Sequence, residues 1–192
     1  MTRFAACVVA VALAACGADK PNQTPLSKEP VSVRGWIEDI EGATHSKTPE
    51  METARRTQLF QATSVWIENA PYASGGVAEN GAFIFLDVPP GNTTIGFNAP
   101  GAEQAQLVMR NIPGNADVFV PGLVLKKNGA SVVNPRDLKV RVPAQVSKAM
   151  PTGRMAIIAG VQVPIVSTPL AEFVDRHDYP RPPGYRAVAM YK

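Results

Sequence analysis

The chain has 192 residues, of which 45% are hydrophobic and 18% are charged, and its formal net charge at pH 7 is +3. This length allows one domain with a hydrophobic core, or one domain with a substantial extension. The small, dispersed positive charge excludes the clustered basic face expected of a nucleic-acid-binding protein. The 18 prolines and 15 glycines favour short strands and frequent turns over long helices.

The N-terminus carries the pattern of an export signal. Met1-Thr2-Arg3 supplies one positive charge, and an unbroken apolar run of 11 residues follows from Phe4 to Ala14. A membrane-spanning helix needs about 20 apolar residues, so this run fits the hydrophobic region of a secretory signal peptide instead. The sequence therefore predicts an exported protein.

The apolar run ends in Leu13-Ala14-Ala15-Cys16-Gly17, which resembles the bacterial lipobox. The resemblance implies a signal peptide over residues 1–15 and transfer of a diacylglyceryl group to the Cys16 thiol. The alternative is ordinary secretion with an accidental cysteine. Acyl chains such as palmitate would anchor the protein stably, since each buried methylene contributes about 0.8 kcal/mol. In a Gram-negative host, glycine rather than aspartate after the cysteine implies the outer membrane, facing the periplasm or the cell surface.

Residues 16–30 are expected to form the lipidated cysteine and a flexible tether. The segment after Cys16 is polar and contains prolines without any periodicity, which is typical of a disordered linker with a reach of roughly 20 Å. The only other cysteine, Cys7, lies in the cleaved segment, so the mature chain cannot form an internal disulfide. Its stability must come from packing.

The following residues predict a β domain with one short helix. Alternating apolar residues indicate strands at 31–42 and 63–68 and a weaker strand at 74–80. Residues 43–60 interrupt this pattern. Thr48-Pro49-Glu50 predicts the start of a surface helix there, with threonine as the N-cap and proline at the first helical position.

The segment from Gly81 to Leu125 is the most informative part of the chain. Phe83 and Phe85 share one face of a predicted strand, and Ile95 and Phe97 share one face of the next strand. Pro89-Pro90-Gly91 predicts a tight turn between them, so we expect a β-hairpin with a buried aromatic face. Further strands are expected at 104–112 and 117–126, the latter broken at Pro121-Gly122. Six or seven short strands with frequent turns favour an antiparallel β-sandwich.

The C-terminal third is expected to be an extension packed on this sandwich, with a second small β unit as the alternative. Residues 138–142 and 155–166 predict strands, the second broken at Pro164. Thr168-Pro169-Leu170 predicts another capped helix start, running to Arg176. The proline-rich segment 179–185 is expected to be extended, and residues 187–191 predict a closing strand.

The sequence NGAFIFLDVPPG at 80–91, with VSVRGWIEDIEG at 31–42, Val65-x-Ile67 and Ala99-x-Gly101, resembles the carboxypeptidase regulatory-like domain. The resemblance covers residues 31–126. It implies a transthyretin-like, or prealbumin-type, β-sandwich, related in fold to carbohydrate-binding modules. It also implies a non-catalytic accessory module, and it supplies no active site. The domain organisation that we predict is therefore a signal peptide (1–15), a lipidated tether (16–30), a β-sandwich (31–126) and an extension (127–192).

Trp36 and Trp66 are the candidate ligand-binding residues. If Val33, Ile37, Val65 and Ile67 face the core, alternation places both tryptophans on the opposite face of their strands. Two exposed indoles would form a stacking platform for sugar rings. The favoured alternative is that the C-terminal extension covers them, since large exposed apolar patches are uncommon on monomers.

No other residues form a convincing catalytic, cofactor or metal site. The acids Glu38, Asp39 and Glu41 are interpreted as a polar strand edge, with Glu38 and Asp39 pointing to opposite sides. The chain has only two histidines, and no spacing resembles a zinc site. The group Asp175, His177 and Asp178 is therefore interpreted as a solvated helix end. No nucleophile elbow or phosphate-binding glycine loop is found.

The sequence thus favours a non-enzymatic, lipid-anchored envelope protein whose β-sandwich is a structural or protein-interaction module. The expected partners are the membrane, through Cys16, and an envelope protein or a glycan. The alternative function is a carbohydrate-binding module that uses Trp36 and Trp66. No cofactor, metal or nucleic acid is expected.

Overall fold

The computed structural model of the protein describes residues 27–41, 48–68, 70–173 and 180–182. Within these ranges the fold is mostly β with one α-helix, which confirms the predicted all-β class. No helix in the described ranges is long and apolar enough to cross a membrane.

Most strands up to Lys126 lie close to the positions that alternation predicts. The third lies at 70–76 and not at 74–80, the strand at 129–132 was not predicted, and the predicted strand at 155–166 is divided between two strands. The strands and the helices, including two short 3₁₀ helices (η), are β1 (Val31–Ile40), α1 (Pro49–Gln61), β2 (Ser64–Ile67), β3 (Ala70–Gly76), β4 (Ala82–Val88), β5 (Gly91–Ala99), β6 (Ala102–Ile112), β7 (Asp117–Lys126), β8 (Gly129–Val132), η1 (Pro135–Asp137), β9 (Lys139–Ala144), β10 (Met150–Ile158), β11 (Val161–Pro169) and η2 (Leu170–Glu172).

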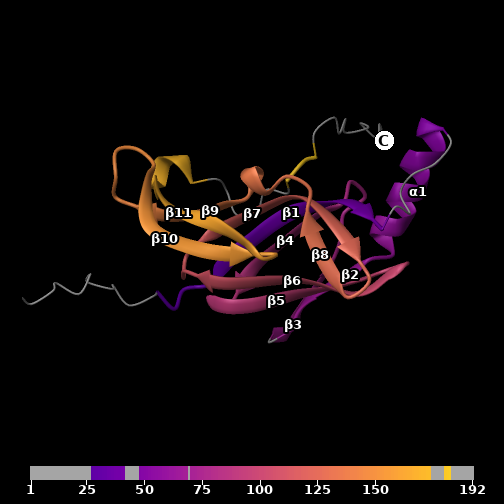
Figure 1. The fold of residues 1–192 in the computed structure, drawn as a ribbon, viewed down its shortest axis with the longest axis horizontal. Coiled ribbons are helices and arrows are strands. Elements are labelled where there is room, and N and C mark those ends of the chain that lie inside the picture. Colours follow the sequence, from indigo (N-terminus) through magenta and orange to yellow (C-terminus); the bar gives the residue numbers. More distant parts are fainter. Residues whose placement is uncertain (1–26, 42–47, 69, 174–179, 183–192) are drawn as a thin grey trace, which may run out of the picture.

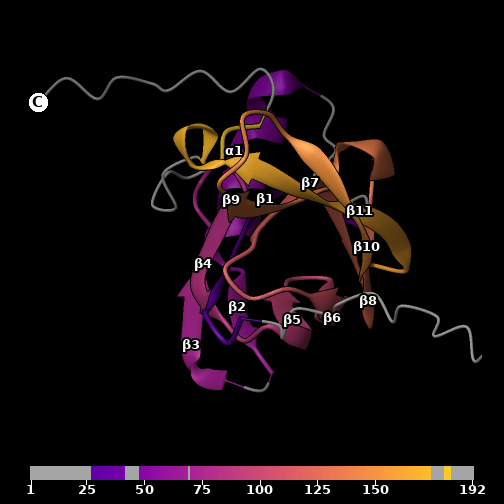
Figure 2. The same cartoon turned by 90° about the vertical axis from the view of Figure 1, so that its left-hand side faces the viewer.

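These strands form one sheet with the order β3-β2-β5-β6-β10-β11-β9-β7-β1-β4, and β8 pairs with β7. The sheet curls into a nearly closed barrel, in which β2, β5 and β6 lie opposite β1, β7 and β9 (Figures 1 and 2). A short antiparallel ladder between β10 and β6 joins the two layers.

The prediction of a purely antiparallel sheet is wrong. The pairs β1–β7 and β9–β11 are parallel, while the other ladders are antiparallel. Both parallel pairs join strands that are not consecutive in the chain, and each needs a long crossover. Alternation within one strand contains no information on such pairing.

The predicted hairpin around Pro89-Pro90-Gly91 is also wrong, although both strands exist. The strand β4 pairs with β1, whereas β5 pairs with β2 and β6. The turn therefore carries the chain from one layer to the other. Phe83 and Phe97 meet edge to face across the core, with ring centroids 5.5 Å apart. The aromatic faces of β4 and β5 are thus buried against each other in facing layers. The alternation of the two strands is the same for this arrangement as for a hairpin, so it could not distinguish them.

The predicted helix start at Thr48 is confirmed. The Thr48 side chain accepts a hydrogen bond from the Met51 backbone N–H (3.3 Å), and Pro49 is the first helical residue. Near the other end of α1, Phe60 is buried. Its ring lies against Gly81, where φ is +84° and any Cβ would be crowded. This contact fixes the helix to the turn that precedes β4.

The second predicted helix, from Thr168, is wrong within the described residues. The strand β11 continues to Pro169, and only the 3₁₀ turn η2 follows. Residues 174–176, the segment at 183–185 and the predicted strand at 187–191 lie outside the described residues.

The strands after Lys126 are part of the same sheet. The strand β9 pairs with β7, and β10 pairs with β6, so residues beyond 126 complete the barrel. The strands β10 and β11 form a hairpin whose turn residues, Ala159 and Gly160, both have positive φ. Pro164, where the sequence predicted a break, lies within β11.

Candidate functional site

The strand β1 is buried on both of its faces. Val33, Gly35 and Ile37 face the core, and the alternate residues of the strand point to the outside of the barrel. Ser32, Arg34 and Trp36 nevertheless have only 0%, 7% and 8% of their surface exposed. A charged side chain this deeply buried needs a partner, because an unpaired buried charge is very costly.

The strand register aligns these outer residues in two rows across β1, β7 and β9. One row contains Ser32, Asp117 and Arg141, and the next contains Arg34, Phe119 and Lys139. The three strands come from distant parts of the sequence, and the parallel pairing of β1 with β7 brings them together.

Asp117 is the centre of this group. Its Oδ1 atom accepts hydrogen bonds from the Ser32 hydroxyl and from Arg34 Nε, both at 3.1 Å. Its Oδ2 atom accepts from Arg34 Nη2 at 3.1 Å and from Arg141 Nη2 at 2.6 Å. The side chain of Asp117 is only 3% exposed. One carboxylate therefore orients two guanidinium groups through charge-assisted hydrogen bonds.

Aromatic rings pack against the same cations. The Arg34 guanidinium lies 5.8 Å from the centroid of Phe119, and that of Arg141 lies 5.9 Å from Phe173. Both distances are within the range of cation–π attraction. Trp36 contacts Phe119 edge to face, with the centroids 5.5 Å apart. The outer face of these strands is thus a packed aromatic and cationic layer.

Two cavities lie on this face. The first has a volume of about 270 Å³ and is lined by Arg34, Phe119, Lys139, Arg141, Pro180 and Arg181. The second has a volume of about 300 Å³, and Lys139 and Arg141 contribute to it as well. Pro180 and Arg181 show that part of the C-terminal segment reaches this face. The first cavity combines four cationic side chains with an apolar ring and a proline, a lining suited to binding an anion.

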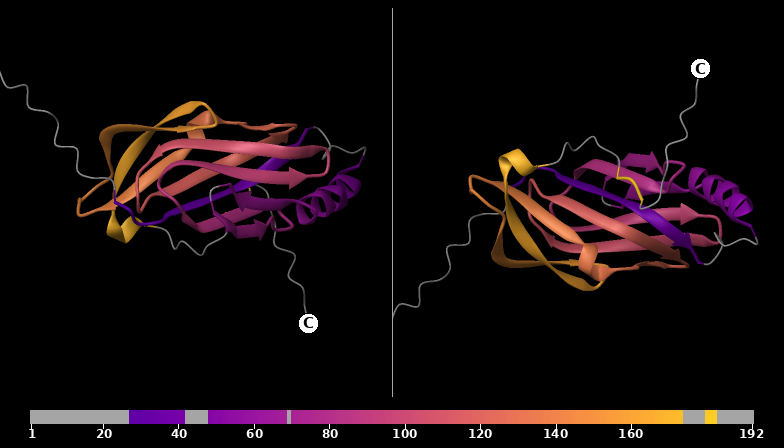
Figure 3. Two further views of the ribbon diagram at one scale, coloured as in Figure 1. Left: turned by 90° about the horizontal axis from the view of Figure 1, so that it is seen from below. Right: turned by 90° about the horizontal axis from the view of Figure 1, so that it is seen from above.

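The structure does not bring the predicted pair Trp36 and Trp66 together. The strands β1 and β2 are not neighbours in the sheet, and they lie in opposite layers (Figures 2 and 3). Trp36 is buried on Phe119, and its Nε1 donates a hydrogen bond to Glu38 Oε2 (3.2 Å).

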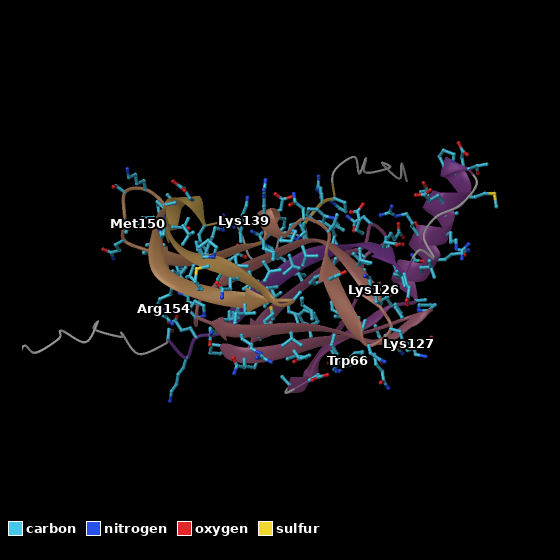
Figure 4. All side chains as sticks on the ribbon, in the orientation of Figure 1. Trp66, Lys126, Lys127, Lys139, Met150 and Arg154 are labelled. Atoms are coloured by element: carbon cyan, nitrogen blue, oxygen red, sulfur yellow. The ribbon has the colours of Figure 1, made fainter. Side chains whose placement is uncertain are left out.

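Trp66 is partly buried on the outside of the opposite layer, where Figure 4 shows it on the far side from Lys139. Its indole lies over Gly96 of β5, and a Cβ on that glycine would overlap the ring. The neighbouring side chains are polar: Gln106 Nε2 donates to Glu68 Oε1 at 2.6 Å. Trp66 therefore lies flat on the sheet and leaves one part of its ring accessible.

The other predicted polar residues are separated or lie outside the described residues. Glu38 bonds to Trp36, and Glu41 Oε2 accepts from the Lys127 backbone N–H (3.1 Å). Cys16, Asp175, His177 and Asp178 are outside the described ranges. In those ranges no three histidine, cysteine or acidic residues gather where they could hold a metal ion.

Sequence reasoning missed the group around Asp117. A signal was present, since Arg34 lies between apolar residues of β1 and Asp117 begins the apolar strand β7, both at positions that alternation directs away from the core. The sequence did not indicate that these positions are buried or that they belong to neighbouring strands.

Comparison of the chain with protein-family models, with curated proteins and with solved structures found no match.

Proposed function

We propose that the protein is a lipid-anchored, non-catalytic component of a bacterial envelope whose β domain is a binding module. The observation that carries the proposal is the segment Leu13-Ala14-Ala15-Cys16 at the end of an apolar run of 11 residues. In this proposal Cys16 carries the acyl chains, and the chain is held at the outer membrane, on its periplasmic or outer side.

A backbone hydrogen bond just before β1 supports this arrangement. The Glu29 carbonyl accepts a hydrogen bond from the Asn115 backbone N–H (3.2 Å), so the first described residues are attached to the turn between β6 and β7. The described residues that precede β1 therefore lie at one end of the barrel (Figure 1). The cationic cavity on the outer face of β1, β7 and β9 supplies a site for a partner.

We also propose that residues 31–126 are related to the carboxypeptidase regulatory-like, transthyretin-like domains. Two features of the resembling motif support this. Asn80 Oδ1 accepts a hydrogen bond from the Ala82 backbone N–H at 3.0 Å, and Gly81 has a positive φ, as a tight turn before a strand requires. Phe83 and Phe85 follow as buried core residues.

A glycan-binding role is the second candidate, and it now depends on Trp66. A partly exposed indole lying flat on a sheet with polar neighbours is suited to stacking on a sugar ring. Trp36, which the sequence placed on the same platform, is 8% exposed and packs on Phe119.

Metabolic labelling with an alkyne analogue of palmitate tests the lipid anchor. The full-length chain would be expressed in a Gram-negative bacterium, together with Cys16→Ser and the matched control Cys7→Ser. We expect label and membrane association for the wild type and for Cys7→Ser, and neither for Cys16→Ser. Label that persists in Cys16→Ser would contradict the proposal.

In-cell crosslinking and pull-down of the lipidated chain then test the binding role. A single protein recovered in near-stoichiometric amount supports an interaction module. Recovery of polysaccharide alone, lost in Trp66→Ala, would replace it with the glycan-binding alternative.

A further inference from the structure

The cluster around Asp117 contains more positive charge than its own ion pairs neutralise. The cavity of about 270 Å³ has Arg34, Lys139, Arg141 and Arg181 in its lining and no carboxylate among its described lining residues. Behind them, Asp117 supplies one negative charge and bonds to two of the four cations. One arginine would neutralise Asp117, so the charge of the second is left unbalanced at the cavity, beside the exposed Lys139 and Arg181.

Arg141 has a donor that is not used. Its Nη2 bonds to Asp117, but its Nε is shielded from solvent and has no hydrogen-bond partner in the described structure. An unsatisfied buried donor costs stability, and it costs more when the group is charged. In this cluster the cost would be removed by an acceptor that enters beside the guanidinium.

Two of the four cations are also held in place before any ligand arrives. Two hydrogen bonds to Asp117 fix the guanidinium plane of Arg34, and Phe119 packs under it. Arg141 is held by one hydrogen bond to Asp117 and by the ring of Phe173. A guanidinium fork that is already oriented binds carboxylate or phosphate oxygens with little loss of conformational entropy. Lys139 and Arg181 are exposed, so they are free to close on a ligand from the solvent side.

We propose that this cavity is a binding site for a small polyanion that carries carboxylate or phosphate groups. Arg141 and Arg34 bind one oxyanion at the base of the cavity, and Lys139 and Arg181 neutralise a second oxyanion nearer to solvent. Phe119 and Pro180 form the apolar walls that contact the body of the ligand. The proposal names the ligand class of the binding module proposed above and rests on that function.

Titration calorimetry of the full-length chain in detergent, with citrate and with pyrophosphate as separate probes, tests the site. We expect saturable binding of at least one probe with one site per chain. Binding of pyrophosphate alone assigns the site to phosphates, and binding of citrate alone assigns it to carboxylates. The absence of saturable binding for both probes overturns the proposal, and it leaves the palmitate-labelling result unaffected.

The variant Lys139→Gln/Arg181→Gln locates the site without disturbing the buried cluster, because both side chains are exposed. We expect affinity to fall about tenfold or more, since two charge-assisted contacts are lost. Lys126→Gln is the matched control: it removes an exposed lysine from β7 at a distance from Lys139 (Figure 4). Equal affinity of the double variant and the control would overturn the proposal.

Arg141→Lys tests the unused donor, because lysine keeps the positive charge but lacks Nε and the planar fork. We expect weaker binding at unchanged folding, which a thermal melt checks. If this variant does not fold, Lys139→Gln/Arg181→Gln still decides the proposal.

Discussion

The two outer faces of the barrel differ in how far their outward-pointing side chains are buried. The face of β2, β5 and β6 follows simple alternation: in β6, Leu107 and Met109 are buried while Val108 between them is exposed. On the face of β1, β7 and β9, the polar and charged residues Ser32, Arg34 and Asp117 are shielded from solvent. Figure 3 presents β5 and β6 in one view and β1 in the other.

The difference shows that polar residues can be buried on an outer face when a neighbouring side chain bonds to them. On β1, Ser32 and Arg34 are as deeply buried as core residues because Asp117 accepts hydrogen bonds from both. On the opposite face another carboxylate, that of Glu68, accepts a hydrogen bond from Gln106 in contact with solvent. Removal of either carboxylate should therefore have very different consequences.

The largest effect is expected for Asp117→Asn. The change leaves two guanidinium groups without a counter-charge, one of them on a side chain that is 8% exposed, and removal of one partner from a buried pair costs about 3–5 kcal/mol. Glu68→Gln is the matched control, and it should change the free energy of unfolding by less than about 0.5 kcal/mol. Urea unfolding measures both. Similar small losses for the two variants would mean that the Asp117 cluster is not buried in solution.

A smaller loss is expected for Gly96→Ala. The added methyl would overlap the Trp66 indole, and such overpacking costs about 1–3 kcal/mol. Gly75→Ala, where nothing lies near the new Cβ, should be close to neutral. In a Trp66→Ala background the cost at Gly96 should disappear, which a double-mutant cycle in urea detects. A cost that is independent of Trp66 would show that the indole does not lie over the glycine.

The two tryptophans should also differ in their access to solvent. In the single-tryptophan variant Trp66→Phe, the remaining Trp36 should emit at shorter wavelength and resist acrylamide quenching, because it is 8% exposed and packs on Phe119. In Trp36→Phe, the remaining Trp66 should be quenched more strongly. Soluble saccharides that quench only Trp66 would favour the glycan-binding alternative. Equal quenching of the two residues would contradict the difference between the faces.

The smallest effect is expected from Glu103, an exposed residue at the start of β6 beside the turn from β5. Hydrogen bonds from the backbone N–H groups of Glu103 and Gly101 lower the pKa of this carboxyl below its usual value of 4.5. A lowered folded-state pKa stabilises the fold above the unfolded-state pKa, and this contribution is lost as the pH falls through the folded-state value. The melting temperatures of wild type and Glu103→Gln should therefore differ slightly at pH 7 and converge in acid. A difference in melting temperature that grows in acid would contradict the lowered pKa of Glu103.

Local sequence signals determined much of the secondary structure. Thr48 and Pro49 identified the start of α1 because capping and a preset φ are properties of neighbouring residues. Alternation placed Phe83, Phe85, Ile95 and Phe97 in the core, where the structure has them. The turn at Ala159-Gly160 was missed. A glycine between two apolar runs is a local signal that could have indicated the hairpin, because glycine readily adopts the positive φ found there.

What only the tertiary structure decided is which strands meet. The same alternation in β4 and β5 is compatible with a hairpin and with two facing layers, and the structure has the facing layers. The parallel pairing of β1 with β7 brings Ser32 and Arg34 to Asp117, which is 85 and 83 residues away along the chain. The physical reason is that strand pairing depends on burying all faces of the sheet together, whereas the sequence pattern of one strand reports only on its own two faces.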